Sequence, residues 1–282
     1  MSKFKRIAIL GPGLLGGSVG LAAKQAGYEA VLWGRRAERV EAAKALGLDS
    51  TTDLRTAVVE ADLVVLAVPV GAMDGLCQLL KSELNDVALV TDVGSVKSLP
   101  HEVAGRHGLP FVGSHPMAGS EQTGIEAARV DLFQGAACAI TNGEGRNDEK
   151  VAALAEFWQD LGCQVFELGV EDHDRAVARI SHLPHAMAVV TASAGLRYPD
   201  DGLLAAGGFR DTTRVASGDP AMWAEIMIEN REAVSDALQD AVHELREMLA
   251  HLAESDQKGL ERYLAVVKDR KDNCNRPDEP TI

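Results

Sequence analysis

The stretch Ile7-Ala-Ile-Leu-Gly11-Pro-Gly13-Leu-Leu-Gly16-Gly17-Ser18 decides the fold of this chain. A short apolar strand here runs into a GxGxxG motif that opens a helix, as in dinucleotide-binding folds. Gly11 permits the tight turn, Gly13 lets the backbone approach a pyrophosphate, and Gly16 allows the helix to pack closely on the strand. Because the start of a helix presents free N–H groups and the positive end of its dipole, we expect the phosphates of a dinucleotide to bind there.

Outward from this motif, β-branched runs alternate with helical patterns as far as about residue 168. This rhythm predicts an α/β fold with a parallel, doubly wound sheet of the Rossmann type. The expected strands are Arg6–Leu10, Ala30–Trp33, Asp62–Val68, Val87–Thr91, Pro110–Val112, Ala136–Thr141 and Gln164–Leu168. The expected helices between them include Leu14–Ala26, Ala37–Leu46 and Asp148–Leu161.

The second half of the chain is expected to be all-helical. Helical periodicity covers Glu171–Gly195, and Asp219-Pro220 is a good helix start with Asp as the N-cap. Apolar residues then recur every three or four positions for about thirty residues, which predicts one long helix that packs against a partner subunit. We therefore expect a dinucleotide-binding domain at 1–168, a helical substrate and dimerisation domain at 169–268, a flexible tail at 269–282, and a homodimer.

Charge and composition exclude several classes of protein. The net charge of −14 disfavours binding to nucleic acid and to anionic lipid surfaces. The four cysteines form no CxxC pair, and no His/Cys cluster has the spacing of a zinc site, so we expect reduced thiols and no metal. No apolar segment approaches the ~20 residues of a membrane span, and the run Ile7–Leu10 is too short for a signal peptide. The expected location is the cytoplasm.

The second strand bears on the choice between NAD and NADP. It ends in Gly34-Arg35-Arg36 and lacks the acidic residue that binds the ribose 2′-hydroxyl in NAD enzymes. Because an arginine is suited to grip a phosphate, we expect NADP, with Gly34 making room and Arg35 or Arg36 on the 2′-phosphate. The alternative is two solvated arginines at a helix start, with NAD as the cofactor.

Further cofactor contacts are expected from residues beside the glycine motif. Leu14 and Leu15 open the helix that follows the motif. Val68 and Pro69 end a later strand, at the edge where an open α/β sheet places its ligand. A plain strand terminator is the alternative for Val68 and Pro69.

The run Val112-Gly-Ser-His115-Pro-Met-Ala-Gly-Ser-Glu121 is expected to be a loop after a strand, where a doubly wound sheet places its chemistry. The ordinary pKa of histidine, roughly 6.5, suits proton abstraction near neutral pH. His115 is therefore the candidate general base.

This run, GSHPMAGSE, resembles a motif of the prephenate/arogenate dehydrogenase family. Four further motifs agree with the resemblance, in order along residues 5 to about 255. They are the glycine motif, Asp92-Val-Gly-Ser95-Val-Lys97, Ser181-His182-Leu-Pro-His185, and Gly207-Gly-Phe-Arg-Asp211-Thr-Thr-Arg214 followed by Ser217-Gly-Asp-Pro-Ala-Met-Trp223.

The resemblance implies oxidative decarboxylation of an anionic cyclohexadienol, with hydride passing to the nicotinamide and loss of CO2 making the ring aromatic. By position in the motifs, His115 is the base, Ser95 orients it, and Arg214 clamps a substrate carboxylate. The resemblance also places six side chains around the substrate: Arg214, His182, His185, Trp223, Glu121 and Asp211, with Glu121 able to pair with Arg214 as a gate. A structural role is the alternative for each, and it is weightiest for Trp223, which also fits the apolar stripe.

Two other functions stay open at this point. A β-hydroxyacid dehydrogenase shares the outline of the fold, but it needs a lysine on the helix that follows the dinucleotide domain, and Arg179–Val190 has none. A non-catalytic dinucleotide-sensing module would not need His115, Ser95 and Arg214 together. Between prephenate and arogenate the motifs do not decide, and we favour prephenate. We expect no chorismate mutase segment before the glycine motif and no regulatory domain after about residue 255.

Overall fold

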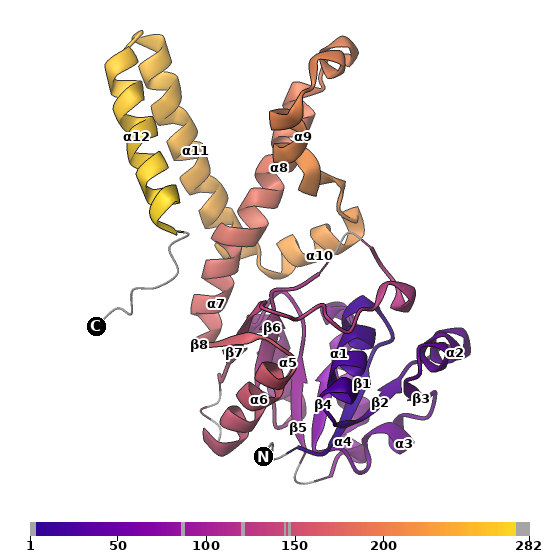
Figure 1. Ribbon diagram of the computed structural model, residues 1–282. Helices are drawn as coiled ribbons and strands as arrows, with labels where there is room; N and C mark the ends of the chain where they lie inside the picture. The colour runs from indigo at the N-terminus through magenta and orange to yellow at the C-terminus, as the bar shows by residue number, and fades with distance from the viewer. Residues whose placement is uncertain (1–3, 86–87, 120–121, 144, 146–147, 275–282) are drawn as a thin grey trace. The chain divides into compact units, whose positions relative to one another are not determined.

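The computed structural model describes residues 4–85, 88–119, 122–143, 145 and 148–274 (Figure 1). The chain divides into two compact units, residues 1–231 and residues 232–282. The first unit contains every strand of the described residues and the helices as far as α10. The second contains nearly all of α11 and the whole of α12.

A five-stranded parallel sheet forms the centre of the first unit, in the order β3-β2-β1-β4-β5. Its strands are β1 (Arg6–Leu10), β2 (Glu29–Trp33), β3 (Asp49–Thr51), β4 (Leu63–Leu66) and β5 (Leu89–Asp92). From β1 the chain adds β2 and β3 on one side of the sheet and then β4 and β5 on the other. This arrangement confirms the doubly wound topology. β1 and β4 carry continuous apolar runs because both faces of the sheet are covered.

Alternate residues of β1 point into two separate apolar cores. Ile7 and Ile9 lie in one core, whereas Ala8 and Leu10 lie in the other. Helices α1 (Leu14–Gln25), α2 (Ala37–Ala45) and α6 (Asp148–Asp160) contribute to the first core. Helices α3 (Leu54–Val58), α4 (Met73–Glu83) and α5 (Ser98–His107) contribute to the second.

The last three strands form a second sheet, which corrects the expectation of a single parallel one. β6 (Gly113–Pro116) pairs antiparallel with β7 (Ala137–Thr141), and β7 pairs parallel with β8 (Gln164–Leu168). The strand expected at Pro110–Val112 makes only an isolated bridge, from Phe111 to Val90 of β5. His115 therefore lies in a strand and not in a loop.

The helical part of the first unit begins with a nearly continuous helix, as predicted. It consists of α7 (Val170–Val177), one π-helical turn (Ala178–His182) and α8 (Leu183–Gly195). Three shorter segments follow in order: the 3-10 turn η4 (Pro199–Leu204), α9 (Gly207–Thr213) and the 3-10 turn η5 (Arg214–Ser217). η5 packs against α8, which brings the arginine motif beside the histidine motif.

The long helix expected from Asp219 onward is interrupted, which is a second correction. α10 (Pro220–Glu229) ends at Asn230, and α11 (Arg231–Ala253) begins directly afterwards. The buried Asn230 amide donates to the Asp174 carbonyl (2.9 Å), so a tertiary contact occupies the break. The three- to four-residue apolar spacing persists across the break, which is why the pattern reads as one helix.

The last helix, α12 (Gln257–Cys274), continues six residues into the segment 269–282 that was expected to be a tail. An i,i+4 ion pair between Lys268 and Asp272 supports this last stretch of helix. None of the helices within the described ranges is long and apolar enough to cross a bilayer.

The N-cap of α10 gives a direct test of the fold. The Asp219 carboxylate accepts from the backbone N–H of Met222 (2.8 Å). We expect Asp219→Ala to lower the free energy of unfolding by about 1 kcal/mol, the usual cost of a lost N-cap. Asp219→Asn, which caps equally well, is the matched control in thermal unfolding. Equal midpoints for the two variants would show that the cap contributes nothing.

Candidate active site

The glycine motif has the geometry that a dinucleotide requires. Gly11 has a φ of +131°, and a Cβ there would lie 2.1 Å from the Ala67 carbonyl oxygen. A Cβ at Gly16 would lie 2.0 Å from the Gly11 oxygen, whereas nothing lies within 4 Å of one at Gly13. The turn therefore demands glycine at Gly11 and Gly16 and leaves open space at Gly13, so these residues fit a bound pyrophosphate.

The residues expected to bind the adenosine ribose lie at the end of β2. Gly34 is buried, and a Cβ there would meet the Pro12 ring at 2.7 Å. Arg35 and Arg36 are exposed, and neither makes an ion pair with a residue that the structure describes. Arg36 occupies the N-cap position of α2. Both guanidinium groups are thus available to an anion.

The remaining cofactor candidates surround the same turn. Leu14 and Leu15, half-buried, form the first turn of α1. Val68 and Pro69 connect β4 to the 3-10 turn η1 (Val70–Ala72), and Val68 approaches Gly11. Both pairs lie at the carboxyl edge of the parallel sheet, as predicted.

His115 lies in β6 opposite Ala139 and is only 7% exposed. Its Nδ1 lies 2.9 Å from Nε2 of His173, and Nδ1 of His173 lies 2.8 Å from the Asp174 carboxylate. His173 and Asp174 come from α7 and are both buried. The three side chains form one hydrogen-bonded row, and sequence reasoning missed two of its members.

The surroundings of His115 keep its imidazole neutral. Burial is the largest cause that lowers the pKa of His115 well below 6.5, and the positive charge of Lys97 lowers the pKa further. Near neutral pH the ring is therefore unprotonated at one nitrogen. A neutral, buried imidazole can accept a proton from a bound hydroxyl group.

Lys97 is a fully buried cation beneath β6. Its ammonium group pairs with Asp92 and donates to the Ser114 carbonyl (2.6 Å), and Asp92 also accepts from the Ser114 N–H (3.1 Å). Burial lowers the pKa of Lys97, and the adjacent carboxylate opposes this shift. The pair fixes the backbone next to His115 to the end of β5. Lys97 belongs to a quoted motif, but nothing in its sequence context signals burial.

The candidate substrate residues His182, His185 and Trp223 lie together. The His185 ring stacks on Trp223 at 3.6 Å, and the His182 ring meets Trp223 edge-on at 6.3 Å. Burial lowers the pKa of His182 to about 4. Nε2 of His182 and Nδ1 of His185 are buried without a hydrogen-bond partner among the described residues. Buried polar atoms of this kind usually have a partner, which can be a bound ligand or an ordered water.

Asn230 joins this group to the row of His115. Its amide nitrogen contacts Nδ1 of His182 at 3.3 Å as well as the Asp174 carbonyl. The structure thus brings His115, His182, His185 and Trp223 into one connected polar region.

The other predicted site residues are not part of this network. Ser95 is half-buried after β5, and its hydroxyl makes no hydrogen bond within the described part of the chain. Arg214 is exposed at the start of η5, and Asp211 is exposed on α9. Glu121 lies outside the described residues. No group of three His, Cys, Asp or Glu side chains in the described ranges could hold a metal ion.

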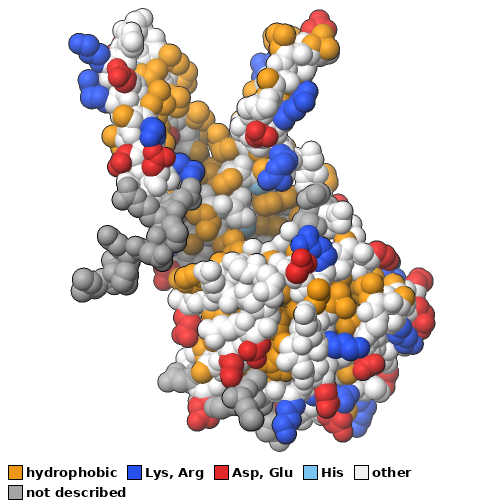
Figure 2. Space-filling view, viewed as in Figure 1, with side chains coloured by type: hydrophobic (Ala, Val, Ile, Leu, Met, Phe, Trp, Pro, Cys, Tyr) orange, Lys and Arg blue, Asp and Glu red, His pale blue; other side chains and the backbone are white. Residues whose placement is uncertain are grey.

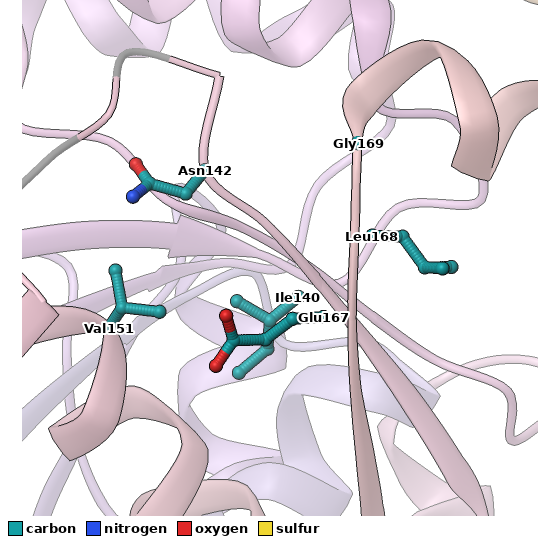
Figure 3. A pocket seen from close by; sticks show the side chains of 6 residues that line it. All are labelled: Ile140, Asn142, Val151, Glu167, Leu168 and Gly169. Carbon is teal, nitrogen blue, oxygen red and sulfur yellow. The ribbon is translucent and has the colours of Figure 1, made fainter. Parts of the chain in front are cut away.

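A separate hollow of about 210 Å³ lies at the ends of β7 and β8 (Figure 3). Ile140, Glu167 and Val151 line it, together with Asn142, Leu168 and Gly169. None of these residues belongs to the glycine motif or to the histidine network. We therefore assign neither cofactor nor substrate to it.

Family models match both halves of this arrangement. The nucleotide-binding domain of prephenate dehydrogenase matches residues 19–167, and its dimerization domain matches residues 170–266. The chain belongs to the prephenate dehydrogenase family. Prephenate dehydrogenase of Bacillus subtilis is 34% identical, over 94% of this chain and 75% of that protein.

Solved structures agree with the family. Prephenate dehydrogenase from Aquifex aeolicus, in complex with hydroxyphenyl propionate and NAD+, superposes with a TM-score of 0.88 at 29% identity, covering 96% of this chain and 98% of that one. Synechocystis arogenate dehydrogenase superposes with a TM-score of 0.85 at 30% identity, covering 95% of this chain and 99% of that one.

The chain is therefore an NAD(P)-dependent enzyme with prephenate/arogenate dehydrogenase activity in tyrosine biosynthesis. The resemblance noted in its motifs is confirmed. The two alternatives, a β-hydroxyacid dehydrogenase and a non-catalytic sensing module, are wrong.

The buried pair of Lys97 and Asp92 predicts a large effect on stability. Lys97→Met leaves the Asp92 carboxylate buried without its counter-charge, and we expect a loss of about 3–5 kcal/mol in the free energy of unfolding in urea. Lys44→Met, which removes an exposed pair with Glu41, should change it by less than about 1 kcal/mol. Adding Asp92→Asn to Lys97→Met should recover part of the loss. Similar losses for Lys97→Met and Lys44→Met would contradict the ion pair.

Proposed function

We propose that this enzyme prefers prephenate as its substrate and NADP as its cofactor, and that His115 is its general base. The observation that carries the proposal is the buried, neutral imidazole of His115, whose Nδ1 is held by His173 while Nε2 makes no hydrogen bond with a described residue. Such a nitrogen can receive the proton of a ring hydroxyl group.

The reaction asks for few groups from the protein. The bound nicotinamide accepts a hydride from the carbon that bears the hydroxyl group. As the hydride leaves, His115 takes the hydroxyl proton at Nε2, and loss of CO2 then makes the ring aromatic. Aromatisation drives the reaction, so the protein mainly supplies position, a proton acceptor and contacts for the carboxylates. Ser95, which follows β5, would hold the same hydroxyl group.

The substrate would lie along the stacked rings of His185 and Trp223. Because Asn230 donates to Nδ1 of His182, Nε2 of His182 carries a hydrogen and needs an acceptor. The keto oxygen of the prephenate side chain is such an acceptor, whereas the ammonium group at the same position of arogenate is not. Prephenate is therefore favoured if Nε2 of His182 meets this position, and not one of the carboxylates that both substrates carry.

Exposed charged side chains of α9 and η5 would select the anionic substrate. Arg214 is exposed and makes no ion pair with a described residue, so it can clamp a substrate carboxylate. Asp211 lies one helical turn before it.

The cofactor preference rests on Gly34, Arg35 and Arg36. No carboxylate ends β2, and the two arginine side chains are free to meet a 2′-phosphate. The Aquifex aeolicus relative was solved with NAD+, so NAD is the alternative that the experiment below must separate.

We further propose a homodimer formed through the C-terminal helices. Apolar side chains lie exposed along the α11–α12 hairpin (Figure 2), among them Leu249 (62% exposed) and Leu252 (60% exposed). Exposed apolar surface of this kind marks a protein interface, and the matching family model is a dimerization domain. Its match begins at residue 170, which supports a domain boundary near 168. The four cysteines are free thiols, in keeping with a cytoplasmic enzyme.

The role of His115 predicts a defect in turnover. We expect His115→Asn to lower kcat by ~10²–10⁴ with a modest effect on KM, because a positioned base contributes about that much. His107→Asn, on the surface beside Asp74, is the matched control and should retain activity. A His115→Asn enzyme within threefold of the wild type would remove His115 from this role.

The cofactor and substrate are tested together by reduced-nicotinamide absorbance with prephenate or arogenate, each with NAD or NADP. The wild type should give its highest kcat/KM with prephenate and NADP. Arg35→Ala/Arg36→Ala should raise the KM for NADP by roughly 10- to 100-fold, the worth of charge-assisted hydrogen bonds, and leave NAD little affected. Arg39→Ala, which removes an ion pair between α2 and Glu126 of the 3-10 turn Ile125–Ala127, is the control. A higher kcat/KM with NAD would overturn the preference.

A further inference from the structure

The row of His115, His173 and Asp174 joins two parts of the fold. His115 belongs to β6, whereas His173 and Asp174 belong to the first turns of α7. Asp174 also accepts the backbone N–H groups of Lys97 and Ser98 at the start of α5, each at 2.8 Å. Three elements therefore hold the row in place.

Asp174 acts only as an acceptor. Burial opposes its ionisation, but hydrogen bonds from His173, Ser98 and Lys97 outweigh burial and lower the pKa of Asp174 to about 2. An ionised carboxylate has no hydrogen to donate, so the hydrogen between Asp174 and His173 must lie on Nδ1 of His173.

This assignment determines the remaining hydrogens of the row. With its hydrogen on Nδ1, His173 in its neutral form can only accept at Nε2. The hydrogen shared with His115 must then lie on Nδ1 of His115, at 2.9 Å from that acceptor. His115 is left with a lone pair on Nε2, the atom that would receive a proton.

We propose that His173 and Asp174 are positioning residues that hold His115 in the tautomer able to act as a base and that stabilise its cation. The proposal rests on the proposed function, because it presumes that His115 receives the proton. When the hydroxyl O–H bond breaks and an N–H bond forms at Nε2, the ring of His115 becomes a cation. Its Nδ1–H bond to His173 then becomes charge-assisted, with the Asp174 carboxylate behind it.

The interposed His173 separates two requirements that conflict in a direct His–Asp pair. A carboxylate bonded directly to His115 would favour its protonated form before substrate binds. Here Asp174 acts one ring away, and the groups around His115 that oppose protonation are Lys97, His173 and His182. The base therefore stays unprotonated while its tautomer is fixed.

The test compares His173→Leu with His173→Gln in the full-length enzyme. Leucine offers no acceptor to Nδ1 of His115, whereas the glutamine carbonyl oxygen can replace Nε2 of His173. We expect His173→Leu to lower kcat by roughly 10- to 100-fold, as when a histidine that binds a metal loses the group that orients its ring. KM should stay within about twofold, and His173→Gln should recover most of the loss. Equal kcat values for the two variants would overturn the proposal.

A spectroscopic readout separates orientation from folding. In nitrogen-15 NMR spectra of histidine-labelled protein, His115 of the wild type should show a protonated Nδ1 and an unprotonated Nε2. His173→Leu should shift His115 towards a mixture of tautomers, and His173→Gln should not. An unchanged His115 tautomer in folded His173→Leu would overturn the proposal even if activity fell. The proposed function fails separately, if His115→Asn remains active.

Discussion

The buried carboxylate of Asp174 is the contact on which the site depends. It receives the first N–H groups of α5, orients His173 and, through its backbone carbonyl, binds the amide of Asn230. A buried carboxylate is stable only when its lone pairs are filled, and here each donor comes from a segment that the site needs. The helical segment that carries His182 and His185 is thereby fastened to the strand that carries His115.

The parallel sheet could be predicted because its signals are local. The glycine motif dictates a strand, a turn and a helix, and buried parallel strands show as apolar runs. Two strands were not predicted from the sequence, for physical reasons. β3 (Asp49–Thr51) is short and polar, and it lies at the edge of the sheet. β6 (Gly113–Pro116) consists of residues with little strand propensity, and its pairing with β7 determines its conformation.

The candidate site likewise contains some residues that the sequence could indicate and others that it could not. His115, His182 and His185 stand in recognisable motifs, so sequence could point to them. His173 and Asp174 stand among acidic residues in the run Val-Glu-Asp-His-Asp, which reads as an exposed first turn of a helix. The packing of α7 against α5 and β7 buries them. Groups that act through another side chain leave little trace in sequence, because their task is defined by a partner far along the chain.

The contact between Gly34 and Pro12 limits how this sequence can evolve. A carboxylate at the tip of β2 would bind a ribose hydroxyl, but any side chain at position 34 would collide with the proline ring of the glycine motif. Proline cannot swing aside as a flexible side chain would. An acidic residue at position 34 therefore also requires a change at Pro12. Neither substitution alone would readily change which nucleotide the enzyme binds.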